Sequence, residues 1–273
     1  MKTKSRIFAG VMAAVAALVV GFTVVGFSGC GGAEINISGS TSISPLMEKL
    51  VAAYKESHDV TINITESGSS AGITDTQNGA VDFGMASREL KASETGVKAT
   101  KIADDGIALI VHNDSEVTNV TADEVYALYA EGTPIRSSLT VAYGREAGSG
   151  TRGAFDELIE NSAGDTLDKL ESGYDAIVTQ YSGTNQIKEA VAGNKAAIGY
   201  ISMGSLDATV KAVSYEGVAA TAANVVNKSY ALSRPFNLVL PTAGLDADAQ
   251  AFVDFILSAA GQAIVESEGY IKV

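Results

Sequence analysis

Three short clusters of serine, threonine and glycine hold the residues of this 273-residue chain that are best suited to chemistry. They occupy residues 39–45 (GSTSISP), 67–72 (SGSSAG) and 142–155 (AYGREAGSGTRGAF). Each cluster leads into a helical pattern, and a helix begins with unpaired N–H groups and the positive end of its dipole. Glycine and hydroxyl side chains at such a point can hold a small anion. Three such loops, the third with Arg145 near its start, predict a site that converges on one oxyanion.

Arg145 and the residues after it make the third cluster the most specific of the three. Ser149, Gly150 and Thr151 would supply N–H groups and hydroxyls at a helix start, while the guanidinium of Arg145 forks onto the same anion. Glu146 could orient that guanidinium by pairing with it. Two ordinary alternatives stay open: such serines and threonines also cap helices without any ligand, and Arg145 could form a surface ion pair of little consequence.

Signatures of enzyme chemistry are sparse. His58 and His112 are the only histidines, they lie far apart in the sequence, and neither has the company of metal ligands. Ser149 stands between two glycines but has no evident histidine partner of the kind that a nucleophile elbow needs, and no Walker loop is present. We therefore expect a binding protein without catalytic residues, metal or cofactor. A secreted phosphatase or hydrolase that uses Ser149 is the distant alternative.

Strand and helix patterns alternate around the first two clusters. The strand patterns cover residues 34–40, 60–67, 81–87 and 107–113. Ser44 is expected to cap the helix that follows the first cluster, with Pro45 at its first position, and residues 73–78 are expected to form a helix after the second. This alternation predicts βαβ units and a parallel sheet, in which ligands bind at the carboxyl ends of the strands.

A second region repeats the arrangement. Thr121 opens a capping box before one helix, residues 139–144 read as a strand that runs into the third cluster, and Ser149 can cap the helix after it. A late strand over residues 234–240 is expected to run back beside residues 107–113, with the C-terminal helices completing the first region. The chain would then cross twice between two lobes. This predicts a cleft with clusters one and two on one wall and cluster three on the other.

The first thirty residues have the pattern of an export signal. Basic residues at positions 2, 4 and 6 precede an uncharged apolar run over residues 7–27, and small residues precede Cys30, the single cysteine. The pattern is typical of a bacterial lipoprotein signal, in which Cys30 carries the lipid. An uncleaved membrane anchor is the alternative, because the apolar run is long enough to span a bilayer. Either way, the rest of the chain is expected to lie outside the cytoplasm, tethered to a membrane.

The charge balance limits the choice of partners. The formal net charge is −13 at pH 7, and removal of the three basic residues of the signal would make it about −16. Nucleic acid is excluded as a partner, because it requires a basic face. An anion would have to be held by local dipoles and one or two buried charges rather than by the field of the whole surface.

The sequence resembles a known family, the phosphate-binding proteins of bacterial phosphate ABC transporters. Members of this family have the second type of periplasmic-binding-protein fold. The segments that carry the resemblance are, in order, GSTSISPLMEKL, ESGSSAGI, VDFGMASREL, YGREAGSGTRGAF, AAIGYIS and SRPFNLV. The resemblance implies an α/β, two-lobed protein with two mixed sheets flanked by helices. It also implies phosphate contacts at Thr41, Ser42, Ser69, Arg145, Ser149, Gly150 and Thr151, with Ser40 and Ser70 as additional candidates.

One position departs from the better-known members of that family. They carry an aspartate just after the serine of the third strand, which accepts the proton of phosphate and helps to reject sulfate. Here the order is Ser87-Arg88-Glu89, so an arginine stands at or near that place. Arg88 could act as a second positive donor or remain a surface residue, and Glu89 could supply the acceptor instead.

The resemblance implies a lipid-anchored, extracytoplasmic protein that captures inorganic phosphate and delivers it to the permease subunits of an ABC importer. The expected organisation is a signal at 1–30, a spacer at 31–34, a first lobe from 35–110 with 239–273, and a second lobe over 111–238. The nearer alternative is the same fold with another oxyanion, such as sulfate, molybdate or tungstate. A sensor or adhesin that has kept the fold also stays open.

Overall fold

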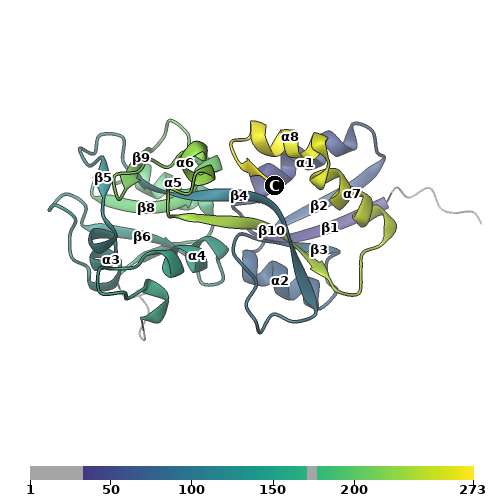
Figure 1. Cartoon of the computed structure of the whole chain (residues 1–273), viewed down its shortest axis with the longest axis horizontal. Helices are drawn as coiled ribbons and strands as arrows, with labels where there is room; N and C mark the ends of the chain where they lie inside the picture. The colour runs from purple at the N-terminus through teal and green to yellow at the C-terminus, as the bar shows by residue number, and fades with distance from the viewer. Residues whose placement is uncertain (1–32, 171–176) are drawn as a thin grey trace, which may run out of the picture. The chain divides into compact units, whose positions relative to one another are not determined.

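The computed structural model describes residues 33–170 and 177–273, and Figure 1 shows their elements. The strands are β1 (Ala33–Gly39), β2 (Val60–Glu66), β3 (Phe83–Ala86), β4 (Val97–Val111), β5 (Asn119–Val120), β6 (Val141–Arg145), β7 (Thr179–Tyr181), β8 (Ala197–Ser202), β9 (Lys211–Tyr215), β10 (Ser233–Pro241) and β11 (Ile271–Lys272). The helices are α1 (Ser44–Lys55), α2 (Ser69–Gln77), α3 (Ala122–Glu131), α4 (Gly150–Leu158), α5 (Thr184–Ala192), α6 (Ala222–Val226), α7 (Ala247–Leu257) and α8 (Ala259–Ser267). Two 3-10 turns cover Leu167–Lys169 and Met203–Ser205.

Eight of the strands pair in one continuous mixed order, β2-β1-β3-β10-β4-β8-β6-β7, while β9 and β11 pair with β4 and β5 pairs with β9. β1 lies parallel between β2 and β3, and β6 lies parallel between β7 and β8. β10 is antiparallel to both β3 and β4, and β4 is antiparallel to β8. The predicted α/β class with mixed strand pairing is confirmed, and β4 and β10 join the two groups of parallel strands.

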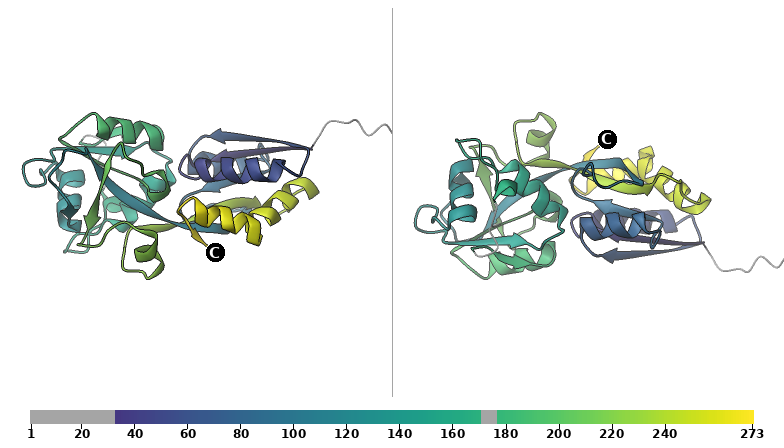
Figure 2. Two further views of the ribbon diagram at one scale, coloured as in Figure 1. Left: turned by 90° about the horizontal axis from the view of Figure 1, so that it is seen from above. Right: turned by 90° about the horizontal axis from the view of Figure 1, so that it is seen from below.

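Two large hydrophobic cores and two smaller clusters stabilise the fold. The terminal core is built from residues between 35 and 103 and between 236 and 270, including Leu46, Phe83 and Phe252. The central core is built from residues between 107 and 232, including Tyr129 and Phe155. Figure 2 shows α7 and α8 beside α1 around the terminal core, where these helices contact one another. The change from one core to the other falls on β4 and β10; the boundaries of two moving lobes stay a prediction.

The pairing of β4 and β10 corrects one expectation from the sequence. β10 does not run beside residues 107–113 but beside Val97–Gly106, the first part of a longer strand whose later part pairs with β8 and β9. Lys98, Lys101 and Asp104 interrupt the apolar pattern of this first part, which hid it from a reading of hydrophobic periodicity. The register shifts between Phe236 and Asn237, so a bulge lies at Ile102, inside the terminal core.

Two of the four helix starts predicted from the sequence are confirmed. Thr121 and Glu124 form the predicted capping box of α3, and the hydroxyl of Ser149 caps α4 by accepting from the N–H of Arg152. Ser44, in contrast, lies inside α1, because the N–H groups of Ile43 and Ser44 already turn onto the carbonyl of Ser40.

The second cluster also differs from the expectation. Its serines form the first turn of α2, which begins at Ser69 and not at residue 73. Gly68 stands at the cap position with φ of 87°, a conformation that favours glycine. The cluster is therefore a helix N-terminus in itself rather than a loop before one.

Candidate anion-binding site

The first cluster leaves β1 at Gly39 and passes tightly beside β3. A side chain at Gly39, with φ of 135°, would place its Cβ 2.3 Å from the carbonyl oxygen of Met85, so only glycine fits there. The turn that follows buries the hydroxyls of Ser40 and Ser42. Because β1 and β3 are parallel neighbours, their carboxyl ends deliver these hydroxyls and Ser87 to one edge of the sheet.

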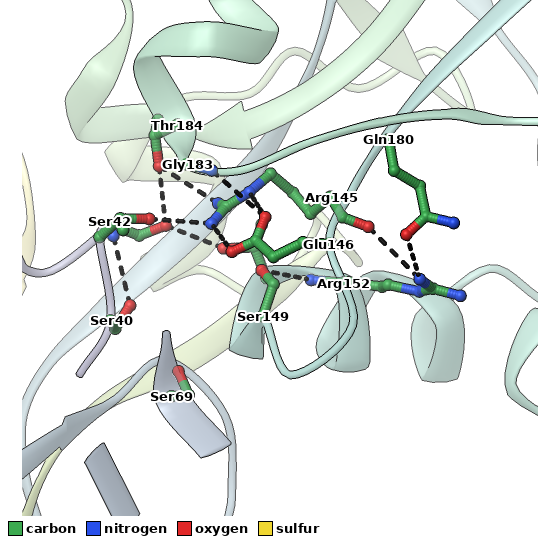
Figure 3. A network of polar contacts seen from close by, with 12 residues as sticks. Ser40, Ser42, Ser69, Arg145, Glu146, Ser149, Arg152, Gln180, Gly183 and Thr184 are labelled. Carbon is green, nitrogen blue, oxygen red and sulfur yellow. Dashed lines mark hydrogen bonds and ion pairs between the residues drawn. The ribbon is translucent and has the colours of Figure 1, made fainter. Parts of the chain in front are cut away.

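Arg145 ends β6, and its side chain extends toward Ser42 of the first cluster and Thr184 (Figure 3). Only 2% of the residue is exposed. Its Nη2 donates to Oγ1 of Thr41 at 2.9 Å, and its Nη1 donates to Oγ1 of Thr184 at 3.3 Å. The backbone N–H of Arg145 donates to the hydroxyl of Tyr200, which fixes the base of the side chain. A single guanidinium thus joins hydroxyls that lie on both sides of the boundary between the two cores.

Glu146 orients that guanidinium, as the sequence suggested. Its two carboxylate oxygens accept from Nε and Nη2 of Arg145, each at 2.8 Å, and one of them also accepts from the N–H of Gly183 at 3.2 Å. Burial raises the pKa of Glu146, but the hydrogen bonds and the charge of Arg145 outweigh burial, so the pKa lies below its ordinary value. The Glu146 carboxylate therefore remains ionised near neutral pH and fixes the orientation of the arginine fork.

The N-terminus of α4 closes against the first and second clusters. Oγ1 of Thr151 lies 2.8 Å from Oγ of Ser42, a hydrogen bond that spans 109 residues of sequence. Gly150 lies so close to α2 that a Cβ there would sit 2.2 Å from Oγ of Ser69 and 2.7 Å from Oγ of Ser87. The bare backbone at Gly150 therefore faces two hydroxyls, at the positive end of a helix dipole.

Ser69 and Ser87 face this N-terminus as a connected pair. The N–H of Ser87 donates to Oγ of Ser69 at 3.1 Å, and the two hydroxyls lie 3.3 Å apart. Ser40 donates to Oγ of Ser87 at 2.9 Å. All three are buried. The sequence prediction did not include Ser87, although its place at the end of the third strand is a signal that could have found it.

The two charged candidates beside Ser87 lie outside this group of hydroxyls. Arg88 is buried, but its guanidinium pairs with both carboxylate oxygens of Glu94, at 2.7 and 3.0 Å, and reaches Oγ of Ser70 at 3.2 Å. The side chain of Glu89 is exposed, and its backbone carbonyl accepts from Arg88. Ser70 instead donates its backbone N–H to the carbonyl of Gly148, next to the start of α4.

Thr184 is a further site residue that sequence reasoning missed. It begins α5 after Gly183, and its hydroxyl lies 3.2 Å from Oγ of Ser42 in addition to accepting from Arg145. A cavity of about 140 Å³ lies beside these groups, lined in part by Thr41, Gly183 and Thr184. A larger hollow around Arg136 contains none of the hydroxyls described above.

Three further expectations concern metal binding, the membrane and the export signal. Within residues 33–170 and 177–273, no three acidic, histidine or cysteine side chains are grouped so that they could hold a metal ion. The helices of the same ranges are all too short or too polar to cross a membrane. The export signal expected over residues 1–30, with Cys30, lies outside the described residues.

Comparison with known proteins then decides the family. A model of the PBP superfamily domain matches residues 28–260. The chain belongs to the PBP superfamily. A solved member from Clostridium perfringens, assigned to phosphate ABC transport as a substrate-binding protein and crystallised with bound phosphate, is 42% identical, with a TM-score of 0.81 over 88% of this chain and 99% of that one.

Two further members of the PBP superfamily extend the comparison. An ABC-type phosphate transport receptor from Vibrio cholerae is 30% identical, with a TM-score of 0.69 over 88% of this chain and 100% of that one. The phosphate-binding protein PstS 2 of Streptococcus agalactiae is 41% identical over 131 residues, which make up 46% of this chain and 43% of that protein. The match to this curated relative therefore spans less than half of its length. The family resemblance predicted from the sequence is confirmed.

Proposed function

We propose that this member of the PBP superfamily captures inorganic phosphate outside the cytoplasm and delivers it to the permease subunits of an ABC importer. The observation that carries the proposal is the convergence of Arg145, α4 and the hydroxyls of Ser42 and Ser69 from both sides of the core boundary. Charge-assisted hydrogen bonds in a buried site suit a small tetrahedral oxyanion. The 42% identical relative with bound phosphate supports the choice of ligand.

The proposed contacts with phosphate are those implied by the sequence together with two residues that the geometry adds. They are Thr41, Ser42, Ser69, Arg145, Ser149, Gly150 and Thr151, with Ser87 and Thr184 added by their hydrogen bonds to this group. We further propose that the protein closes over the ligand as two lobes, residues 35–110 with 239–273 and residues 111–238, with β4 and β10 as the crossing strands. Lipid on Cys30 would tether the protein, so Cys30→Ser should release it from the membrane fraction.

Binding without chemistry follows from what surrounds the serines. The hydroxyl of Ser149 accepts from the N–H of Arg152 and serves as a helix cap. His58 bonds to Ser57 and to the carbonyl of Tyr54, and Nδ1 of His112 accepts from Asp114, so neither histidine is placed to act as a base for Ser149. Nucleophilic catalysis requires such a base within hydrogen-bonding reach. A chromogenic phosphate ester should therefore not be turned over.

Titration calorimetry with inorganic phosphate tests the proposal. Arg145→Ala removes the charged donor and should weaken binding at least about 100-fold, because hydrogen bonds to charged groups contribute about 1.5–3 kcal/mol each and this residue supplies more than one. Arg136→Ala is the matched control, since Arg136 also pairs with a glutamate but lies on the surface. An Arg145→Ala protein with native affinity would contradict the proposed site. Competition by sulfate, molybdate or tungstate that exceeds phosphate would instead assign the site to another oxyanion.

A further inference from the structure

A buried ion pair stands where β4 and β10 pass between the two cores. Nη2 of Arg234 lies 3.2 Å from Oδ2 of Asp105, and each side chain is 1% exposed. From the central core, Ser202 at the end of β8 donates to Oδ1 of Asp105 at 2.9 Å. Buried ion pairs seldom stabilise a fold more than apolar side chains of the same volume would. The pair is therefore a candidate for a role other than stability.

The remaining donor of Arg234 leads to the anion site. Pairing between β3 and β10 ends at Ala86, opposite Asn237. Beyond that point, Nη1 of Arg234 donates to the carbonyl of Ser87 at 3.2 Å, and Nδ2 of Asn237 donates to the carbonyl of Arg88 at 3.1 Å. The two peptide groups just past the end of the strand are thus held by side chains of β10 rather than by its backbone.

The orientation of Ser87 decides where two site hydroxyls lie. Its N–H donates to Oγ of Ser69, and its own hydroxyl accepts from Ser40 and faces Gly150. A change in the backbone at Ser87 therefore moves the hydroxyls of both Ser69 and Ser87 relative to the start of α4. The carbonyl held by Arg234 belongs to that same residue.

Arg234 does not face the anion as a free charge. Burial lowers the pKa of Arg234, and the charge of Asp105 raises it. The positive charge of Arg145 also lowers it, so the two arginines repel each other electrostatically. However, Nε and Nη2 of Arg234 both donate to Asp105, and Nη1 donates to Ser87. The charge of Arg234 is compensated by Asp105, and its guanidinium donors already have partners. Arg234 can therefore affect the anion only through Ser87.

We propose that Arg234 is a positioning residue of the anion site, holding Ser87 in its binding orientation and linking it through Asp105 to Ser202 on β8. This inference rests on the proposed function, because Ser87 is assigned there to the phosphate contacts. A contact chain that begins on a strand of the central core thus ends on a hydroxyl on the other side of the core boundary. Substitution of Arg234, Asp105 or Ser202 should weaken phosphate binding, although these side chains do not contact the ligand.

The test compares phosphate titrations with thermal melting of the full chain. The variant Arg234→Met with Asp105→Asn removes both charges together, so no unpaired charge is buried, and should weaken phosphate binding about tenfold or more through loss of the hydrogen bond to Ser87. Gln262→Met is the matched control. Gln262 is buried and bonds to the carbonyl of Ile102 in the bulge of β4, but not to Ser87. It should lower the melting temperature while the phosphate Kd stays within about twofold of native.

A double-mutant cycle with Ser87→Ala separates positioning from general destabilisation. In the Ser87→Ala background, loss of the Arg234 contact should cost less in Kd than in the native background, because the Ser87 hydroxyl is already absent and only the position of Ser69 still depends on this contact. Arg234→Lys keeps the charge beside Asp105 and protects folding, yet one ammonium cannot reproduce the fork, so it should also bind phosphate more weakly. Equal losses in both backgrounds, or native affinity in both Arg234 variants, would overturn the inference. Failure of the wild-type protein to bind phosphate would overturn the proposed function, and this inference with it.

Discussion

Gly150→Ala should show how closely the start of α4 must approach Ser69 and Ser87 for ligand binding. Gly150 is the first residue of α4, and its backbone has no positive φ that would strain alanine. In a helix, alanine is favoured over glycine by up to about 1 kcal/mol. The added Cβ would, however, sit 2.2 Å from Oγ of Ser69, 2.7 Å from Oγ of Ser87 and 2.9 Å from Cβ of Ser69. Alanine is therefore compatible with the helix itself, but its Cβ prevents the close contact of α4 with α2 and with Ser87.

The size of the effect follows from these distances. Ordinary contact begins at 3.4 Å, so α4 and the serines must separate by about 1 Å. A shift of this size takes the hydroxyls of Ser69 and Ser87 out of hydrogen-bonding distance of an anion held by Arg145. Each hydrogen bond to a charged group contributes about 1.5–3 kcal/mol, so the loss of two should cost about 3 kcal/mol or more. That corresponds to a phosphate Kd at least about 100-fold weaker.

Calorimetric titration and thermal melting of the same samples check this prediction. Gly153→Ala is the matched control, because Gly153 lies on the same helix and its Cβ would meet only the side chain of Arg88, with Cδ at an ordinary 3.4 Å. Gly153→Ala should melt at or slightly above the wild-type temperature, whereas Gly150→Ala should melt below it because the added Cβ forces α4 away from Ser69, and only Gly150→Ala should lose affinity. Native affinity in Gly150→Ala would show that α4 does not close against Ser69 when phosphate is bound, and the reasoning would be refuted.

Three further predictions concern single groups. Thr184→Val keeps the shape of the side chain but removes the hydroxyl shared with Ser42, so calorimetry should show phosphate binding about tenfold weaker. Glu146→Gln should be less stable than wild type at pH 7 in urea unfolding; because the folded state lowers the pKa of Glu146, this difference should shrink as the pH falls through the acidic range, and a pH-independent difference would contradict it. Burial raises the pKa of Asp105 from 3.8 to about 6 despite the nearby Arg234. The contribution of this group to the free energy of unfolding should therefore be fully present below pH 3.8 and should fall by about 3 kcal/mol as the pH rises through 6. The same titration of Asp105→Asn should lack that pH-dependent loss, and an identical profile would refute the assignment.

Much of the site could be predicted because its residues carry local signals. Arg145, Ser149 and Thr151 stand within one short stretch, and the helix start that they form depends on neighbours in sequence. The pairing of Arg145 with Glu146 is likewise a contact between adjacent residues. Local rules of capping and charge pairing apply directly to such groups.

The residues that escaped prediction depend on contacts far apart in the sequence. Thr184 meets Ser42 across 142 residues, and Arg234 meets Asp105 across 129. Ser87 enters the site only because β3 lies next to β1, and the first part of β4 is recognisable only beside β10. No periodicity within one segment encodes such neighbours, so these parts of the site needed the folded arrangement.

The division of the sequence between the two cores has a consequence for how the chain acquires its fold. The central core draws on one uninterrupted stretch between residues 107 and 232, whereas the terminal core needs Phe236, Phe252 and Val265 from near the C-terminus. Closing a long loop carries an entropic cost before its contacts form. We therefore expect the middle of the chain to fold first, while the first strands stay incomplete until nearly the whole polypeptide has been made.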